Sequence, residues 1–292
     1  MSLLSLIAVF LIEQLQPLNY RRAVAEPLGV WADFIETRFN AGAYQHGIIA
    51  WCVAVLPPVL LVGGLYVLLY SLNPLLAWAL NVGVLYLTMG FRQFSHHYTE
   101  IQLALRLGDL ERARQLLAEW LGRSAYDLGS EDIARLAIEE ALAASHRHVF
   151  AVLLWFVILP GPCGALLYRM SAVIRERWGR GNAAQHNDFS VFSRQVFGMI
   201  DWLPSRATAS AFAIVGDFED AVYCWRTQPA QWPERDLGIV LASGAGALGV
   251  QLGRPIADGV EVSDRAELGL GDPADVDFMQ SAVGLVWRAT VL

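Results

Sequence analysis

Residues 39–91 read FNAGAYQHGIIAWCVAVLPPVLLVGGLYVLLYSLNPLLAWALNVGVLYLTMGF, and no Asp, Glu, Lys or Arg stands between Arg38 and Arg92. A helix that is apolar on every side has no face suited to water. A helix that crosses a bilayer needs about 20 such residues. The stretch therefore predicts two membrane-spanning helices, near residues 47–72 and 75–91. Asn73-Pro74 is the predicted turn, because proline disfavours helical geometry in the residue before it.

Two prolines lie inside the first predicted span. Pro57 and Pro58 carry no backbone N–H, so they predict a kink of a kind that neighbouring helices can accommodate. The kink either allows the helix to pack against its neighbours or, as the functional alternative, acts as a hinge beside a substrate cavity.

Three further stretches are predicted to associate with the membrane. Residues 3–12 are apolar and lack the basic start and the cleavage site of a signal peptide, which predicts a retained membrane-embedded helix. Residues 13–46 mix charged with aromatic side chains, as interfacial segments do. Residues 149–168 carry no charge but are interrupted by LPGPCG at 159–164, so they predict either a kinked crossing or a re-entrant half-helix. We favour the re-entrant form, because it places both neighbouring arginine-rich regions on the cytoplasmic side.

The composition excludes several classes of protein. The 292 residues have a mean hydropathy of +0.40 and 17% charged side chains, a balance that predicts a membrane protein with a polar portion. The net charge of -7 argues against a nucleic-acid partner, because phosphates attract clustered basic residues. All 21 basic residues are arginine, which excludes a phosphate-loop lysine and a Schiff-base lysine. The three cysteines form no C-x-x-C pair, so neither a disulfide framework nor a cysteine zinc site is predicted.

The chain is predicted to have four regions. Residues 1–91 contain the N-terminal membrane helix, the interfacial segment and the transmembrane hairpin, and residues 92–147 form a polar helical domain. Within that domain apolar residues recur at helical spacing from Leu110 to Leu121; Asp109 is the predicted cap of this helix and Ser130 that of the next. Residues 148–253 contain membrane-associated helices and a Gly-rich segment. Residues 254–292 form an acidic loop and a C-terminal helix, which either packs on the protein or belongs to a longer natural tail.

Four histidines bracket the polar domain, two at each end: His96, His97, His146 and His148. Glutamates lie close to both pairs in the sequence. If the two ends of the domain meet at the membrane surface, these groups converge as ligands of zinc or another divalent ion, or as a proton-transfer site. The spacing matches no standard metal motif, and the alternative is a set of interfacial histidines without a ligand role.

A glycine pattern and two arginines are the remaining candidates. Gly244, Gly246 and Gly249 match G-x-G-x-x-G, but that pattern binds a dinucleotide only between a strand and a helix. This helix-rich sequence favours close helix packing or a tight loop instead. Arg147 lies at the predicted lipid edge, and Arg206 lies in an apolar context. Each either extends to phosphate headgroups or binds an anionic ligand.

Three sequence segments carry a family resemblance. They are GDLERAR at 108–114 with LGR at 121–123 and ARLAIE at 134–139, LLWF at 153–156 with PCGALLY at 162–168, and GALGVQLG at 246–253. As an ordered set they resemble the CobD/CbiB family of membrane proteins. The resemblance implies cobalamin biosynthesis, in which this family joins an aminopropanol-type linker to adenosylcobyric acid in an ATP-dependent amide synthesis. It also implies ATP and a divalent metal as cofactors, and a large anionic corrinoid ligand held by Arg147, Arg206 and the loop from Gly244 to Gly253.

The sequence also departs from this family. After Ala-Ile-Glu the family continues with a Glu-Asn-x-Ser-Asp-Gly signature, whereas AASHRH stands at 143–148 here. The carboxylates and the amide are missing, so catalytic roles are not carried over and enzyme status stays open. DWLPSR at 201–206 and GDFEDA at 216–221 resemble the AmpE signalling branch of the same superfamily, which is linked to β-lactamase induction. That resemblance implies a non-catalytic membrane protein that binds a protein partner.

Together these observations predict an all-α, polytopic integral membrane protein with an inserted cytoplasmic helical domain, in a bacterial-type inner (cytoplasmic) membrane. The lipid bilayer is its predicted environment, and its partner is either a corrinoid ligand or another protein. The first functional hypothesis is a role in or near amide attachment to adenosylcobyric acid. The second is an AmpE-type signalling or interaction protein.

Overall fold

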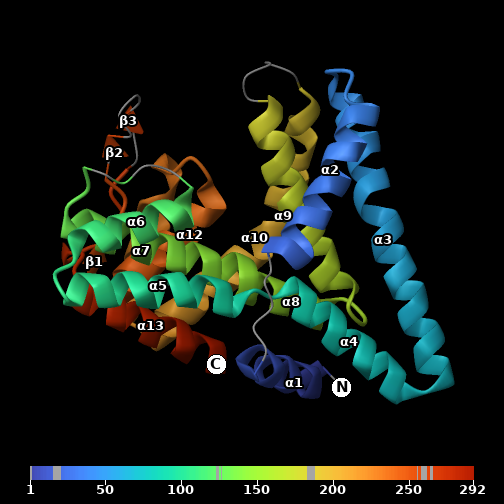
Figure 1. Ribbon diagram of the computed structural model, residues 1–292, viewed down its shortest axis with the longest axis horizontal. Helices are drawn as coiled ribbons and strands as arrows, with labels where there is room; N and C mark the ends of the chain where they lie inside the picture. The colour runs from blue at the N-terminus through green and yellow to red at the C-terminus, as the bar shows by residue number, and fades with distance from the viewer. Residues whose placement is uncertain are drawn as a thin grey trace. The chain divides into compact units, whose positions relative to one another are not determined.

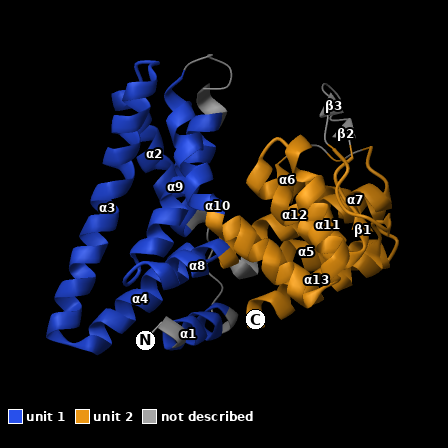
Figure 2. Ribbon diagram, turned by 180° about the vertical axis from the view of Figure 1, so that it is seen from behind, with its two compact units in different colours: residues 1–93, 151–202 blue, residues 94–150, 203–292 orange. Residues whose placement is uncertain are grey.

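The structure is a computed structural model that describes residues 2–15, 21–122, 125, 127–182, 188–254, 256–257, 262–263 and 266–292. Most of its described elements are helices (Figure 1). The chain divides into two compact units, each assembled from two separate stretches of sequence (Figure 2). Unit 1 comprises residues 1–93 and 151–202, and unit 2 comprises residues 94–150 and 203–292.

The helices of unit 1 are α1 (Ser2–Leu15), η1 (Arg21–Ala25), α2 (Glu26–Phe39), α3 (Tyr44–Leu72), α4 (Pro74–Thr88), α8 (Ala151–Ile158) and α9 (Cys163–Asn182). Two helices, α5 (Phe91–Arg106) and α10 (Phe189–Val215), continue from one unit into the other. The remaining elements belong to unit 2: α6 (Leu110–Leu121), α7 (Ser130–Ser145), η2 (His146–Phe150), α11 (Phe218–Thr227), η3 (Pro229–Gln231), α12 (Arg235–Leu248), β1 (Val250–Gln251), β2 (Ile256–Ala257), β3 (Val262–Ser263), β4 (Asp272–Pro273) and α13 (Val276–Val291).

The predicted helical hairpin is formed by α3 and α4. Asn73 separates the two helices, and its side chain accepts a hydrogen bond from the Leu75 N–H over 2.9 Å, so the predicted turn is confirmed. Helix α3 has 29 residues, but α4 has only 15 and ends at Thr88. At about 1.5 Å per residue, α4 measures roughly 22 Å and is too short to cross a hydrocarbon layer of about 30 Å unaided. The prediction of two full-length spans is corrected on this point.

Two helical stretches among the described residues have the length and composition of a membrane span, Tyr44–Leu72 and Ser130–Ile158. In the second, more than half of the apolar window is buried inside the protein, as in an ordinary core helix. In the first, only 11% is buried, and Leu60 and Leu61 are 71% and 69% exposed. Contiguous apolar surface of this extent marks a contact with lipid or another apolar partner. Together with the apolar composition, α3 indicates a membrane protein.

Helices α2, α3, α9 and the start of α10 enclose the core of unit 1. The Trp178 ring lies 4.7 Å from that of Phe189, and its indole N–H donates to the Ala32 carbonyl over 3.1 Å. Gly47 lies so close to the Phe189 carbonyl that a Cβ would collide with it. A side chain at Gly47 would therefore separate α3 from α10.

Prolines remove backbone N–H donors within α3 and at the turn between α8 and α9. Helix α3 continues through Pro57 and Pro58; because Pro58 has no N–H, the Ala54 carbonyl loses its usual donor. The Trp31 indole of α2 donates to that carbonyl instead, over 3.1 Å. At residues 159–162 the chain leaves α8 and turns into α9, which places the break where the sequence predicted it.

Unit 2 is organised around α7, against which α6, α12 and α13 pack. Asp109 accepts a hydrogen bond from the Arg112 N–H over 3.0 Å, which confirms the predicted cap of α6. Helix α7 starts at Ser130 as predicted, but its N-cap residue is Gly129 and no side chain caps it. The predicted serine cap is therefore wrong.

The glycine pattern lies within and at the end of α12. A Cβ on Gly244 would meet the Leu142 side chain at 2.8 Å, and one on Gly246 would collide with the Asp220 carbonyl. Gly249 ends the helix with a φ of 68°. The structure thus confirms close helix packing and corrects the expected loop: α12 continues to Leu248, and only the residues after it leave the helix.

The acidic segment is not entirely a loop. Parallel strands β1 and β4 pair Val250 with Asp272, and β2 pairs with β3 in the antiparallel sense. Residues 255, 258–261 and 264–265 of the predicted acidic loop lie outside the described residues. Helix α13 packs on α7 and α12, and the Tyr98 hydroxyl donates to the Met279 carbonyl over 2.8 Å. Of the two alternatives for the C-terminal helix, the structure shows packing on the protein.

Candidate ligand-binding site

The candidate site begins where α7 changes its winding. After Ser145 the helix continues as one π-helical turn, η2, before it becomes α8. A π-turn accommodates an extra residue, and such turns occur frequently at functional sites. This one covers His146–Phe150, and with Ala143–Ser145 it contains the positions where the family resemblance expects its polar signature.

Two arginines from different elements reach the start of α12. Arg147 of η2 lies 2.9 Å from Glu234 (Nη2 to Oε2), and Arg206 of α10 lies 2.8 Å from Asp236 (Nη1 to Oδ1). Glu234 is the N-cap residue of α12 and Asp236 belongs to its first turn. Two cations and two carboxylates are therefore gathered at one helix start, within unit 2.

These ion pairs are only partly buried. The side chains of Arg147 and Glu234 are 31% and 41% exposed, and those of Arg206 and Asp236 are each 24% exposed. Pairs with this access to solvent contribute about 1 kcal/mol or less to stability. An anion that enters the site can therefore replace the carboxylates at small cost to the fold, and the arginine fork suits carboxylate or phosphate.

One hydrogen bond and one aromatic contact hold the π-turn against α10. His146 is fully buried, and its Nδ1 lies 2.9 Å from the Thr208 hydroxyl. The Phe150 and Phe212 rings meet edge to face at 5.7 Å. These contacts hold the backbone of η2 on both sides of Arg147 and so restrict the positions that its guanidinium can reach.

The comparisons with known proteins agree on one family. The model of the CobD/Cbib protein family matches residues 18–286. The chain belongs to the CobD/CbiB family. The cobalamin biosynthesis protein CobD of Stutzerimonas stutzeri is 35% identical over 97% of this chain and 93% of its own length. That of Chromobacterium violaceum is 35% identical over 74% of this chain and 68% of its own, and CbiB of Salmonella typhimurium is 24% identical over 84% and 78%. No solved structure matches the chain.

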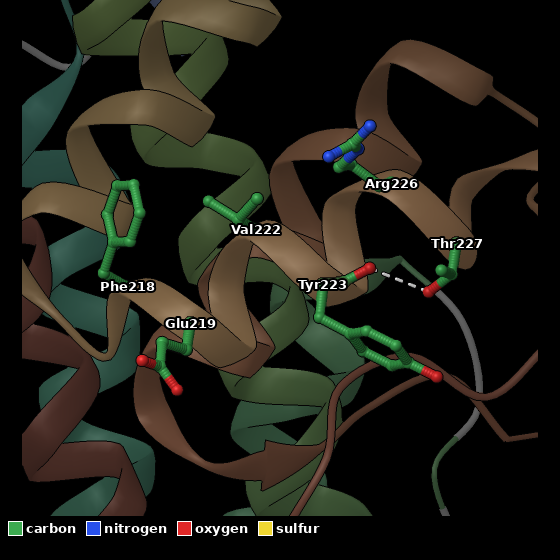
Figure 3. A pocket seen from close by; sticks show the side chains of 6 residues that line it. All are labelled: Phe218, Glu219, Val222, Tyr223, Arg226 and Thr227. Atoms are coloured by element: carbon green, nitrogen blue, oxygen red, sulfur yellow. Dashed lines mark hydrogen bonds between the residues drawn. The ribbon is translucent and has the colours of Figure 1, made fainter.

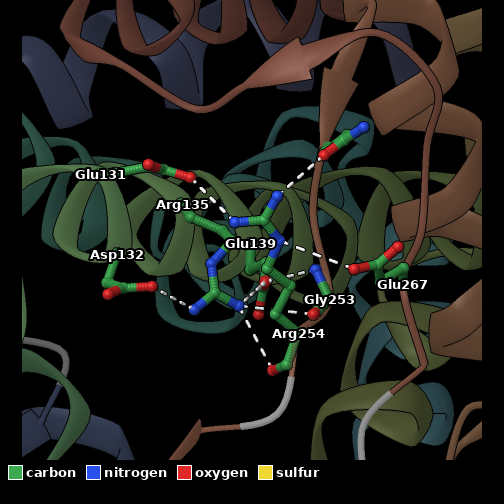
Figure 4. Close-up of polar contacts among 8 residues, drawn as sticks. Glu131, Asp132, Arg135, Glu139, Gly253, Arg254 and Glu267 are labelled. Atoms are coloured by element: carbon green, nitrogen blue, oxygen red, sulfur yellow. Dashed lines mark hydrogen bonds and ion pairs between the residues drawn. The ribbon is translucent and has the colours of Figure 1, made fainter.

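The first family segment of this CobD/CbiB protein holds a polar cluster between α7 and the segment after β1 (Figure 4). Arg135, 3% exposed, lies 2.7 Å from Asp132 and 3.7 Å from Glu139. Glu139 accepts a hydrogen bond from the Gly253 N–H over 2.8 Å, and Arg135 donates to the Gly253 carbonyl over 3.4 Å. Outside this buried centre, Arg254 pairs with Glu131 at 3.0 Å. The cluster joins the GALGVQLG segment to ARLAIE, so Gly253 is held by a structural contact.

The sequence analysis did not predict the Arg135 cluster, and it did not predict the carboxylate partners of Arg147 and Arg206. For the Arg135 cluster a signal was present, because Asp132, Arg135 and Glu139 follow the three- and four-residue spacing of helical ion pairs. For the site at α12, Arg147 and Arg206 were named in advance, but their carboxylate partners were not. Glu234 lies 87 residues from Arg147 in the sequence, and Asp236 lies 30 from Arg206.

The four predicted histidine ligands lie as two pairs: the His96 and His97 rings are 6.1 Å apart on α5, and His146 and His148 belong to η2. Exposed His96 lies 3.6 Å from Glu100, the His97 ring stacks on Trp120 at 6.2 Å, and His146 contacts Thr208. His148 lies half-buried in η2. Among the described residues, no group of three or more His, Cys, Asp or Glu side chains is placed to hold a metal ion. The predicted convergence of these histidines is not found there.

A surface pocket of about 460 Å³ lies along α11 (Figure 3). One helix alone supplies its lining residues: Phe218, Glu219, Val222, Tyr223, Arg226 and Thr227. Phe218 and Tyr223 are more than half exposed. Because no second element of the described residues lines it, this pocket is a helix surface and lacks the enclosure of a ligand site.

Proposed function

We propose that this CobD/CbiB chain is an inner-membrane protein that acts in the ATP-dependent attachment of the aminopropanol linker to adenosylcobyric acid. Membership of a family whose relatives are named cobalamin biosynthesis proteins supports the pathway. The observation that carries the binding role is the convergence of Arg147 and Arg206 on the start of α12. In this proposal the two guanidinium groups bind an anionic group of the corrinoid ligand.

The chemistry of the site limits what these residues do. Arginine is always charged at physiological pH, so Arg147 and Arg206 bind and orient an anion and do not transfer protons. Amide synthesis from a carboxylate and an amine draws its free energy from ATP. Among the described residues, no group of three or more His, Cys, Asp or Glu side chains is placed to hold the divalent metal that the resemblance implies. We therefore assign binding roles only, and we leave Gly244 and Gly246 out of the ligand contacts, because their α-carbons face Leu142 and the Asp220 carbonyl.

The proposal includes a multi-pass membrane topology. Helix α3 crosses the bilayer, α4 returns part of the way beside it, and the α8–α9 break forms a re-entrant or kinked segment. The exposed apolar face of α3 and the ten arginines of residues 13–46 and 92–147 support this arrangement. The polar helices that include α5, α6 and α7 lie on the cytoplasmic side. Cysteine labelling in intact spheroplasts at Ser71 and Gln115, both exposed, tests the two sides separately.

Product formation tests the function. The full-length protein in detergent is incubated with adenosylcobyric acid, ATP, Mg²⁺ and aminopropanol or its phosphate ester, and the amide is quantified by liquid chromatography and mass spectrometry. We expect Arg147→Ala and Arg206→Ala each to lower kcat/KM about tenfold or more, because each removes a charge-assisted hydrogen bond. Arg112→Ala, on the exposed face of α6, is the matched control. Equal activity in all variants would contradict the binding role.

A second candidate function is a non-catalytic AmpE-type membrane protein that binds a protein partner. The observation in its favour concerns the positions where the family has its polar signature. Two of them hold Ala143 and Ala144, which are each 5% exposed and packed as core residues. Absence of product in the same assay, together with normal cobalamin synthesis after deletion of the gene, would favour this candidate over the first.

A further inference from the structure

A buried hydrogen bond within unit 2 joins the two elements that carry the arginines. His146 stands directly before Arg147 in η2, and Thr208 stands two residues after Arg206 in α10. The Nδ1 atom of His146 lies 2.9 Å from the Thr208 hydroxyl, and both residues have almost no exposed surface. The bond therefore lies close to the backbone from which both guanidinium side chains extend.

The chemistry of the two groups lets this bond form in either tautomer of the imidazole. A hydroxyl both donates and accepts, so Thr208 pairs with the Nδ1 atom of His146 whether or not that nitrogen carries a proton. Because both side chains are buried, the removal of one partner leaves the other without its hydrogen bond in the interior, which is unfavourable. The bond therefore specifies one position of η2 along α10.

The winding of η2 makes the arginine position depend on such a contact. In an α-helix the side-chain direction advances by about 100° per residue, so the extra residue of a π-turn rotates the side chains that follow by a similar angle. The His146 N–H donates to the carbonyls of both Leu142 and Ala143, where the helix passes from one winding to the other. The directions of His146 and Arg147 thus depend on a rare winding, and Thr208 supports it from α10.

Helix α12, whose start carries the two carboxylates, is held against the same part of α10. The hydroxyl of the fully buried Ser243 donates to the carbonyl of Ala209, the residue after Thr208, over 2.8 Å. Helix α12 also packs on α7, which continues into η2. Buried contacts therefore fix both η2 and α12 to one short stretch of α10.

From these observations we infer that His146 and Thr208 are positioning residues of the arginine site. Their bond holds η2 at one place on α10, so that Arg147 and Arg206 reach the same anionic group. Neither positioning residue contacts the ligand, since both side chains are buried. The inference rests on the proposed function, because it needs the two arginines to bind an anion, and it adds the residues that set their relative position.

Binding of adenosylcobyric acid to the full-length protein in detergent tests the inference, by equilibrium dialysis with detection of the corrinoid absorbance. Thr208→Val removes the hydroxyl at nearly constant shape. We expect it to raise the dissociation constant about tenfold, because one guanidinium no longer reaches the anion. Thr208→Ser keeps the hydroxyl and is expected to bind as the unmodified protein does. Thr227→Val makes the same change at the exposed end of α11 and is the matched control.

A double variant separates positioning from stability. Thr208→Val alone leaves the Nδ1 atom of His146 without this partner, whereas His146→Leu/Thr208→Val removes both groups of the bond. We therefore expect the melting temperature to recover at least in part in the double variant. The position of η2 is not restored, so the dissociation constant is expected to stay raised. An affinity that returned together with the melting temperature would overturn the inference, because the bond would then act through stability alone.

The product assay gives a second readout. A residue that only positions the arginines affects the binding of the corrinoid and leaves the reacting atoms unchanged. Thr208→Val is therefore expected to raise the KM for adenosylcobyric acid and to leave kcat nearly unchanged. A lower kcat at an unchanged KM would contradict the positioning role.

Failure of this inference and failure of the proposed function give different results. If Arg147→Ala and Arg206→Ala weaken corrinoid binding but Thr208→Val and His146→Leu do not, the inference alone is wrong. If the arginine variants bind as the unmodified protein does, or if the unmodified protein does not bind adenosylcobyric acid, the proposed function and the inference are both wrong.

Discussion

The indole N–H of Trp155 donates a hydrogen bond to the Ile200 carbonyl over 3.1 Å. Pro204 stands four residues after Ile200 inside α10 and has no N–H, so the helix itself lacks this donor. The same arrangement occurs in α3, where Pro58 leaves the Ala54 carbonyl without its backbone donor and the Trp31 indole donates to it. In both places a tryptophan from another helix replaces a backbone bond that proline removed. Such replacement is needed wherever water is excluded, because an unpaired carbonyl is costly there.

Replacement of Trp155 by Phe is therefore expected to destabilise the protein by about 1–3 kcal/mol, since the Ile200 carbonyl loses its donor. Pro204→Ala returns an N–H to α10, so the double variant Trp155→Phe/Pro204→Ala is expected to lose less than Trp155→Phe alone. Denaturant unfolding in detergent gives the four free energies of this double-mutant cycle. Strictly additive effects would show that the indole does not compensate for the proline.

The carboxylates at the start of α12 are expected to compete with the ligand for the arginines. Glu234→Gln and Asp236→Asn remove that competition, so each is expected to tighten binding of an anionic corrinoid several-fold. Their effect on the free energy of unfolding is expected to stay within about 1 kcal/mol, because the pairs are partly exposed. Glu119→Gln, on the exposed face of α6, serves as the control. Weaker corrinoid binding in both variants would mean that the carboxylates belong to the ligand contacts.

Arg135 is expected to be the most sensitive charged residue of unit 2. Arg135→Met leaves the buried Glu139 carboxylate without its cation, which in general costs about 3–5 kcal/mol. Faster amide hydrogen exchange at residues 250–254 is expected to accompany the loss, because Glu139 and Arg135 hold Gly253. Arg112→Met provides the exposed control. Unchanged exchange at 250–254 would show that the β1–β4 pairing alone fixes this segment.

Cys224 is expected to be the slowest of the three cysteines to react. Burial, together with the nearby Asp220 carboxylate, raises the pKa of the Cys224 thiol from 9.0 to about 11. The neutral thiol is thus favoured in the folded state. Its contribution to stability is complete below pH 9 and declines as the pH rises toward 11. Alkylation of the folded protein at pH 8, followed by peptide mass spectrometry, is expected to modify Cys52 and Cys163 first, since both are only partly buried.

The alkaline part of this prediction has its own control. Cys224→Ala removes the titrating thiol, so the variant is expected to lose less stability than the unmodified protein between pH 9 and pH 11. Parallel losses in the two proteins would show that other groups govern alkaline unfolding.

The sequence alone determined the helical hairpin, its Asn73-Pro74 turn, the α6 cap at Asp109, the break at 159–164 and the family. Each of these depends on residues that are neighbours in the chain, or on an ordered set of short motifs. It also named Arg147 and Arg206, because an arginine in an apolar setting needs an anionic partner.

Only the tertiary structure decided which groups meet. It gave those arginines Glu234 and Asp236 and placed Trp155 beside Ile200. Among the described residues it brought the predicted histidines into no group that could hold a metal ion. The physical reason is that periodicity and capping fix the conformation of a segment, whereas a contact across tens of residues depends on how whole helices pack. The packing of helices depends on the shapes and burial of many side chains together, and this combined effect cannot be read from local patterns in one sequence.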